Sequence, residues 1–274
     1  MAEYDPVYLS LDDKPDAILE AMAGLVTQHD QVTAQNQRRR RLPWLFLVIG
    51  VVLIGLDYAV GFDARIFGVA GAAALVAAVV TWFVARRSRV QNISPHYDTA
   101  REVIHTLRDD LHPKGTFFGQ IDLTGARQPQ KLSREGTNVL GLTVHYYRDE
   151  WLGLKAKLYD GNMLRFSTIE RTKERVGYYK RGTISGKQKW KPPKLASGQE
   201  IKVRVSVNPE AYEVVPRADV SAGTRVGVYT IDELDTTGGI VTLLASAPAG
   251  VVGSDDILAV LKMTYSLLQR KGVA

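Results

Sequence analysis

Residues 151–169 read WLGLKAKLYDGNMLRFSTI, two runs of alternating apolar and polar side chains on either side of a turn. Asp160 and Gly161 form the Asp-Gly pair that favours a tight turn between antiparallel strands, because glycine adopts the backbone angles that this turn needs. Successive side chains of a strand point to opposite faces, so the leucines are expected to meet a core while Lys155 and Lys157 face water. The stretch therefore predicts a β-hairpin.

The alternating pattern continues on both sides of this hairpin. Short runs rich in β-branched and aromatic residues predict further strands: TFFGQIDL (116–123), LGLTVHYY (140–147), IKVRVSV (201–207), TRVGVYTI (224–231) and IVTLLASA (240–247). We expect residues 113–274 to form one β-rich domain, barrel-like or sandwich-like, that ends in a helix at 254–271. A separate unit after about residue 209 is the alternative.

Two amphipathic helices are expected upstream of the β-rich domain. Residues 1–37 form an arm with seven acidic side chains and one basic one, and Pro15 marks a helix start within it. In residues 95–112 the apolar side chains recur at intervals of three and four, which is the period of a helix with one apolar face. These side chains are Ala100, Val103, Ile104, Leu107 and Leu111.

Between these helices lie two long apolar runs, 42–61 and 66–85. A helix of about 20 residues matches the roughly 30 Å of a bilayer's hydrocarbon core. The runs predict a transmembrane hairpin within residues 38–89. The expected fold class is thus an α+β membrane protein, with a two-helix transmembrane hairpin, a cytosolic β-rich domain and flanking amphipathic helices.

Arginines at both ends of the apolar segment predict its topology: Arg38, Arg39, Arg40 and Arg41 precede it, and Arg86, Arg87 and Arg89 follow it. Lys and Arg beside a span are retained on the cytoplasmic side. We therefore expect a multi-pass inner-membrane protein with both termini in the cytoplasm.

Two features inside this segment suggest function. Asp57 is expected to pair with Arg65 near the outer interface, with an ion pathway as the alternative, because ionisable groups in a bilayer are costly and functional. Small residues let helices approach closely, and here they are Gly68, Ala70, Ala72, Ala74 and Ala78. They predict packing against the first span or a second copy, and we expect a homo-oligomer.

The charge of the chain is unevenly distributed. The whole chain carries +6, whereas residues 165–204 hold twelve lysines and arginines against three glutamates, a formal +9. Within this stretch we expect a basic patch for a membrane headgroup or another anionic partner: Lys180, Arg181, Lys187, Lys189, Trp190, Lys191 and Lys194.

Several interpretations of this patch stay open. It is a solvated strand face that protects an edge, a surface attracted to anionic lipid, or a site for a nucleotide-like phosphate ligand. The acidic N-terminal arm is a further partner for it. Nucleic acid is the ligand that we favour least.

The sequence contains no recognisable catalytic or cofactor motif. It has no cysteine, and His105 and His112 lack a third ligand at the spacing of a zinc motif. GTISGK (182–187) is one residue shorter than a phosphate-binding P-loop, and Gln188 stands where that loop needs Ser or Thr. We therefore expect no metal, no cofactor and no enzymatic activity.

The predicted function is a non-catalytic membrane anchor, adaptor or scaffold. Its β-rich domain would recruit a protein or ligand on the cytosolic side of the lipid bilayer. A ligand-gated oligomer that forms a pore or disrupts the membrane is the first alternative. An enzyme with an unrecognised site is the second.

Overall fold

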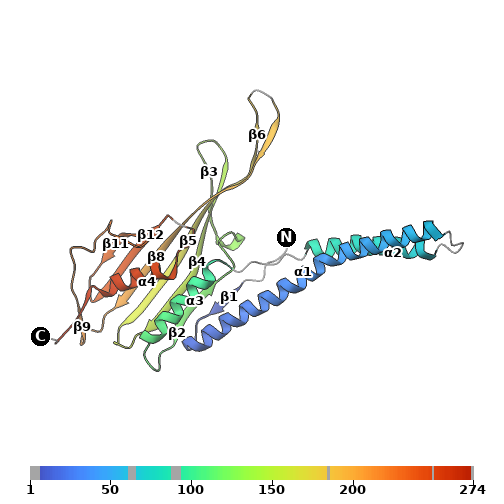
Figure 1. Cartoon of the computed structure of the whole chain (residues 1–274). Coiled ribbons are helices and arrows are strands. Elements are labelled where there is room, and N and C mark those ends of the chain that lie inside the picture. Colours follow the sequence, from blue (N-terminus) through green and yellow to red (C-terminus); the bar gives the residue numbers. More distant parts are fainter. Residues whose placement is uncertain (1–6, 61–65, 88–93, 184–185, 249, 273–274) are drawn as a thin grey trace. The chain divides into compact units, whose positions relative to one another are not determined.

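A nine-stranded antiparallel sheet dominates the protein (Figure 1). The computed structural model describes residues 7–60, 66–87, 94–183, 186–248 and 250–272, without the side chains of 28–30, 32–40, 57–60, 66–67 and 84–87. In spatial order the strands are β1 (Tyr8–Ser10), β2 (Phe117–Asp122), β4 (Thr143–Lys157), β5 (Met163–Arg175), β8 (Lys194–Ser206), β12 (Ile240–Ala247), β11 (Tyr229–Asp235) and β10 (Arg225–Val226), and β3 (Leu132–Thr137) pairs with β4 beside this path.

The predicted hairpin is confirmed and forms the centre of this sheet. Strands β4 and β5 pair from Lys157 with Met163 to Val144 with Arg175, and β5 pairs with β8 over the same length. Gly161 in the connecting turn has a φ of +85°, a left-handed conformation that glycine adopts without steric penalty. These three strands are 13 to 15 residues long, well above the usual 5–6.

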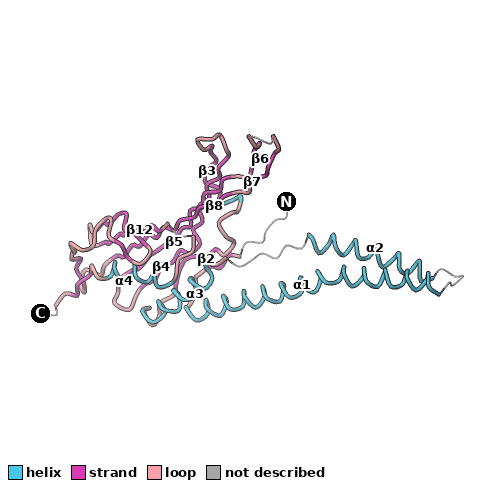
Figure 2. The backbone as a smooth tube through the Cα atoms, turned by 45° about the horizontal axis from the view of Figure 1, so that its top comes forward, coloured by secondary structure: helices cyan, strands magenta, loops and turns pink. Residues whose placement is uncertain are grey.

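The two faces of the sheet have different surroundings. Alternate side chains such as Leu154, Phe166, Val203 and Leu243 are buried in one core with helices α3 (His96–Leu107) and α4 (Ser254–Tyr265) and the first residues of α1 (Pro15–Val60). Figure 2 shows α3 and α4 on the same side of the sheet. The intervening side chains form the opposite, open face, which α3 and α4 do not cover (Figure 2).

The barrel-like or sandwich-like arrangement that we predicted is therefore wrong. Strands β1 and β10 lie at opposite ends of the strand order, and in the described residues no pairing joins them. A sheet needs a partner only for its apolar face. Here helices supply that partner, so neither closure of the sheet nor a second large sheet is required.

Several shorter elements complete this unit. Helix α3 is followed by the 3₁₀ turn η1 (Arg108–Asp110), and η2 (Pro129–Lys131) leads into β3. Helix α4 ends at Tyr265, before the predicted end at 271, because β13 (Leu268–Arg270) pairs with β9 (Tyr212–Val214). Strands β6 (Tyr178–Arg181) and β7 (Gln188–Lys191) form a separate two-stranded ribbon.

The chain divides into two compact units, residues 1–22 with 93–274, and residues 23–92. The strands after residue 209 belong to the first unit. Helix α1 begins in the first unit and ends in the second, so the expected helix near Pro15 and the apolar run from Leu42 are parts of one helix. Helix α2 (Ile66–Arg87) lies wholly in the second unit.

The structure contradicts the predicted transmembrane hairpin. In the part of the chain that it describes, no helix is both long enough and apolar enough to cross a membrane.

This finding corrects every prediction that depended on the spans 42–61 and 66–85. They are the α+β membrane fold class, the multi-pass inner-membrane location with two cytoplasmic termini, and the functions of membrane anchor, adaptor, scaffold and pore. The interpretation of the basic patch as a surface for anionic lipid is not tested by this finding and stays a prediction.

In the second unit α1 and α2 approach closely at two glycines that the prediction did not include. A Cβ atom on Gly71 would lie 2.6 Å from Cγ1 of Ile54, and one on Gly50 would lie 2.9 Å from Leu75. Of the predicted packing residues, Ala78 is buried, Gly68 and Ala74 are half-buried, and Ala70 and Ala72 are exposed. Self-association through them stays a prediction.

The predicted topology residues are mostly outside the described side chains. Arg41 is exposed. Arg65 and Arg89 lie outside the described residues, and the same is true of the side chains of Arg38, Arg39, Arg40, Asp57, Arg86 and Arg87.

Candidate anion-binding site

Three cations lie in one cross-strand row on the open face of the sheet. Lys155 of β4 is the direct partner of Arg165 in β5, and Arg165 is the direct partner of Arg204 in β8. We call Lys155, Arg165 and Arg204 the basic row. Residues in such register have Cβ atoms about 4.5–5.5 Å apart, so three positive side chains project side by side from adjacent strands.

Further side chains extend this row on the same face. Lys157 follows Lys155 two residues along β4, and Lys202 precedes Arg204 by two residues in β8, so both share the face of the row. At the β2 end the exposed ring of Phe118 is opposite Lys155. At the other end Thr242 of β12 is opposite Arg204.

A hollow of about 380 Å³ adjoins the row at the β2 edge. We call it the lysine hollow, because Lys114, Lys155 and Lys157 line it together with His112, Phe118 and Met163. It thus combines three ammonium groups with one aromatic ring. This composition suits a ligand that carries negative charge at one end and a flat apolar group at the other.

The cations of the row have no ion-pair partner in the part of the chain that the structure describes. Among the described residues, the ion pairs of the sheet involve other side chains, such as Arg171 with Glu200 and Lys131 with Asp149, and none involves the row or its flanking lysines. Like charges directly opposite each other destabilise a sheet by some tenths of a kcal/mol per pair. An arrangement with two such contacts, and with no described carboxylate paired to these cations, costs stability, and a bound anion would offset that cost.

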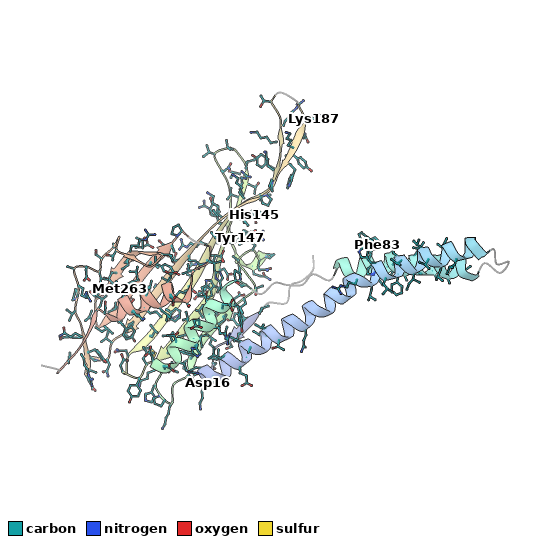
Figure 3. All side chains as sticks on the ribbon, viewed as in Figure 1. Asp16, Phe83, His145, Tyr147, Lys187 and Met263 are labelled. Carbon is teal, nitrogen blue, oxygen red and sulfur yellow. The ribbon has the colours of Figure 1, made fainter. Side chains whose placement is uncertain are left out.

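The basic patch predicted from the sequence lies elsewhere, mostly in the β6–β7 ribbon. Lys180 and Arg181 belong to β6, Lys189, Trp190 and Lys191 to β7, and Lys194 begins β8, while Lys187 lies near the tip of the ribbon (Figure 3). All of them are exposed. Trp190 and Tyr179 are opposite each other with ring centroids 5.0 Å apart, so one face of the ribbon is aromatic.

A buried polar cluster on the helix-covered face fixes the strands that carry the row. His96 at the start of α3 stacks on Trp151 with ring centroids 4.3 Å apart, and its Nε2 lies 2.9 Å from Oε2 of Glu170. Nε1 of Trp151 donates to Oε1 of Gln199 at 3.0 Å. These contacts join α3 to β4, β5 and β8, and sequence reasoning identified none of them.

The carboxylates of Glu170 and Asp122 have lowered pKa values. Burial alone would raise the pKa of Glu170, but hydrogen bonds from His96 and Thr172 outweigh burial and the pKa lies below its ordinary value. For Asp122, the contacts of Lys131 and Thr124 likewise outweigh burial and lower the pKa.

Asp149 behaves in the opposite way. Burial raises the pKa of Asp149 despite the Lys131 ammonium 2.6 Å away. Its second carboxylate oxygen, Oδ2, is buried without a hydrogen-bond partner among the described residues, which fits this penalty on the charged form.

In the described residues no group of three or more His, Asp or Glu side chains is placed to hold a metal ion. His105 is exposed on α3, and His112 lines the lysine hollow. Expectations of no metal, no cofactor and no enzymatic activity stay predictions.

Comparisons with known proteins add no constraint on the site. No model of a protein family, no curated protein and no solved structure matches the chain. The function is therefore inferred from the geometry of the side chains alone.

Proposed function

We propose that this chain is a non-catalytic binding protein that holds a nucleotide-like ligand on the open face of its sheet. By this we mean a small molecule with two or more phosphate groups and a flat aromatic group. The observation that carries the proposal is the basic row, in which Lys155, Arg165 and Arg204 are in direct register and unpaired among the described residues.

The phosphates belong on the row for geometric reasons. Adjacent strands are about 4.7–4.9 Å apart, and successive phosphates of a polyphosphate are a few ångströms apart, so one chain of phosphates reaches cations on neighbouring strands. Arg165 and Arg204 offer planar guanidinium groups that donate two parallel hydrogen bonds to a phosphate, and Lys155 adds a point charge.

The flat group of the ligand belongs in the lysine hollow. Phe118 lies at the end of the row beside Lys155, and its side chain is 50% exposed. An aromatic ring that is exposed beside cations offers a stacking surface for a base, worth about 1–3 kcal/mol. His112 and Met163 complete the lining of that hollow.

Binding of ATP, inorganic triphosphate and adenosine to the full chain, measured by calorimetry at constant ionic strength, tests this proposal. Arg165→Gln is expected to weaken ATP binding about tenfold or more, since a charge-assisted hydrogen bond contributes about 1.5–3 kcal/mol. Arg225→Gln, which removes an exposed arginine from β10 at the far edge of the same sheet, is the matched control. Phe118→Ala should weaken ATP binding but leave triphosphate binding unchanged.

Arg165→Gln also gives a second readout, which is stability. In the absence of phosphate it should raise the free energy of unfolding in urea by some tenths of a kcal/mol, because it relieves two like-charge contacts. Failure of the wild-type chain to bind ATP and triphosphate, or an equal loss in Arg165→Gln and Arg225→Gln, contradicts the proposal. If the chain binds a single-stranded oligonucleotide far more tightly than ATP, the function is nucleic-acid binding and the nucleotide proposal is wrong.

A further inference from the structure

A second hollow, of about 450 Å³, lies on the helix-covered side of the sheet between α3, α4 and the turn after β4. We call it the leucine hollow, because its apolar lining consists of Leu107, Leu158, Leu164, Leu258 and Leu261, together with the ring of Tyr265. Its volume is within the roughly 300–1,000 Å³ of small-molecule pockets, which are mostly apolar with a few polar groups.

The ring of Tyr265 belongs to this lining, but its hydroxyl is not on the surface of the hollow. That hydroxyl is buried and has no hydrogen-bond partner among the described residues. Burial, and then the nearby carboxylates of Asp160 and Asp110, raise the pKa of Tyr265, so the phenol stays neutral at pH 7.

Negative charge dominates the rim of this hollow. Asp109, Asp110 and Asp160 line it against a single cation, Lys262. Asp109 accepts a hydrogen bond from Arg108, and Asp160 accepts two from Asn162. The carboxylate of Asp110 has neither an ion pair nor a hydrogen bond among the described residues.

We propose that the leucine hollow binds a small amphipathic amine, whose apolar body lies among the leucines and whose ammonium group contacts the exposed carboxylate of Asp110 at the rim. The apolar lining favours an apolar body, and the acidic rim favours a positive charge. Leu164 points to the core face of β5 whereas Arg165 points to the open face, so this site is independent of the proposed phosphate site.

Octylamine, with octan-1-ol as a neutral probe of the same length, tests the proposal on the full chain by titration. We expect octylamine to bind at least about tenfold more tightly than octan-1-ol, which corresponds to about 1.4 kcal/mol. Asp110→Asn, an exposed position, should bring the two affinities together. Asp255→Asn, in the first turn of α4 and also exposed, is the matched control and should leave their ratio unchanged.

Two more variants keep the result specific to this hollow. Leu258→Trp fills the space and should abolish binding of both probes, and Tyr265→Phe, which removes only a buried hydroxyl, should leave the ratio of the two affinities unchanged. Thermal melts establish that each variant folds. Equal binding of the two probes to the wild-type chain, an unchanged ratio in Asp110→Asn, or full binding in folded Leu258→Trp would each overturn the proposal.

Discussion

The pair of His96 and Glu170 makes folding sensitive to acid. Nε2 of the buried imidazole donates to the carboxylate at 2.9 Å, and Oγ1 of Thr172 donates at 2.9 Å as well. The pKa of Glu170 is lower in the fold than its ordinary value of 4.5. Its contribution to stability is therefore complete above about pH 4.5 and is lost as the pH falls through the lower, folded-state pKa.

Glu170→Gln tests whether this one carboxylate contributes to the loss of stability in acid. We expect the free energy of unfolding at about pH 7 to fall by about 1.5–3 kcal/mol, because a charge-assisted hydrogen bond inside the fold is lost. The loss of stability between about pH 5 and about pH 3 should be smaller than in the wild type. Urea denaturation across that range measures both effects, and an acid dependence identical to the wild type would contradict the assignment.

At the same scale, the sequence predicted the orientation of the site residues but not their assembly. Alternation places Lys155 and Lys157 opposite the buried leucines of β4, and the structure has them exposed. That Lys155, Arg165 and Arg204 meet in one row depends on the register between strands. Register follows from turn geometry and long-range packing. The predicted patch in the β6–β7 ribbon is a denser run of cations in the sequence, whereas the residues of the row are far apart along the chain.

At the scale of elements, strand β2 depends on a glycine that approaches its neighbour closely. Gly119 has a φ of +147°, and a Cβ atom there would lie 2.0 Å from the carbonyl oxygen of Gly153 in β4. Gly119→Ala should lower the free energy of unfolding by about 2–4 kcal/mol, since both backbone strain and a backbone clash oppose it. Gly125→Ala is the matched control, because Gly125 has a φ of +88° but nothing within 4 Å of its Cβ position.

The control should cost only about 1–2 kcal/mol, which is the strain of a left-handed residue by itself. Chemical denaturation of the two variants separates the cost of the backbone clash at Gly119 from the cost of backbone strain alone. If Gly119→Ala were no more destabilising than Gly125→Ala, β2 would have to lie further from β4 than the structure shows.

Helices were predicted less well than strands because their ends depend on tertiary contacts. The apolar stripe of α3 was evident from spacing, and the structure buries Ala100, Val103 and Ile104. The end of α4 was placed too late, since the pairing of β13 with β9 interrupts a pattern that otherwise continues. No local signal between Pro15 and Leu42 shows whether one helix or two are present, and the structure has one, even though Pro43 lies inside it.

For the whole molecule, composition and periodicity predicted a β-rich domain with few helices but not its architecture. Whether a sheet closes into a barrel depends on its edges and on what covers its apolar face, and both are properties of the assembled chain. In this protein, core side chains from α3, α4 and the start of α1 occupy that face. The apolar runs of the second unit predicted a membrane protein, and the structure contradicts the membrane functions that followed from that prediction.

The arrangement of the sheet also predicts how stability is distributed over the first unit. Strands β5 and β8 are paired on both edges and bury alternate side chains, whereas every residue of β7 is exposed and β6 pairs with β7 alone. Isolated two-stranded ribbons are marginally stable in water. In hydrogen exchange, amides of 164–168 and 201–205 should open only with global unfolding, and those of 178–191 that the structure describes should exchange orders of magnitude faster through local opening.

Phosphate ligand on the basic row should slow exchange of the amides in 164–168 and 201–205 further and leave exchange in the β6–β7 ribbon unchanged. If amides of the ribbon exchange as slowly as those of β5, the ribbon must pack against a partner, and the prediction of local opening is wrong.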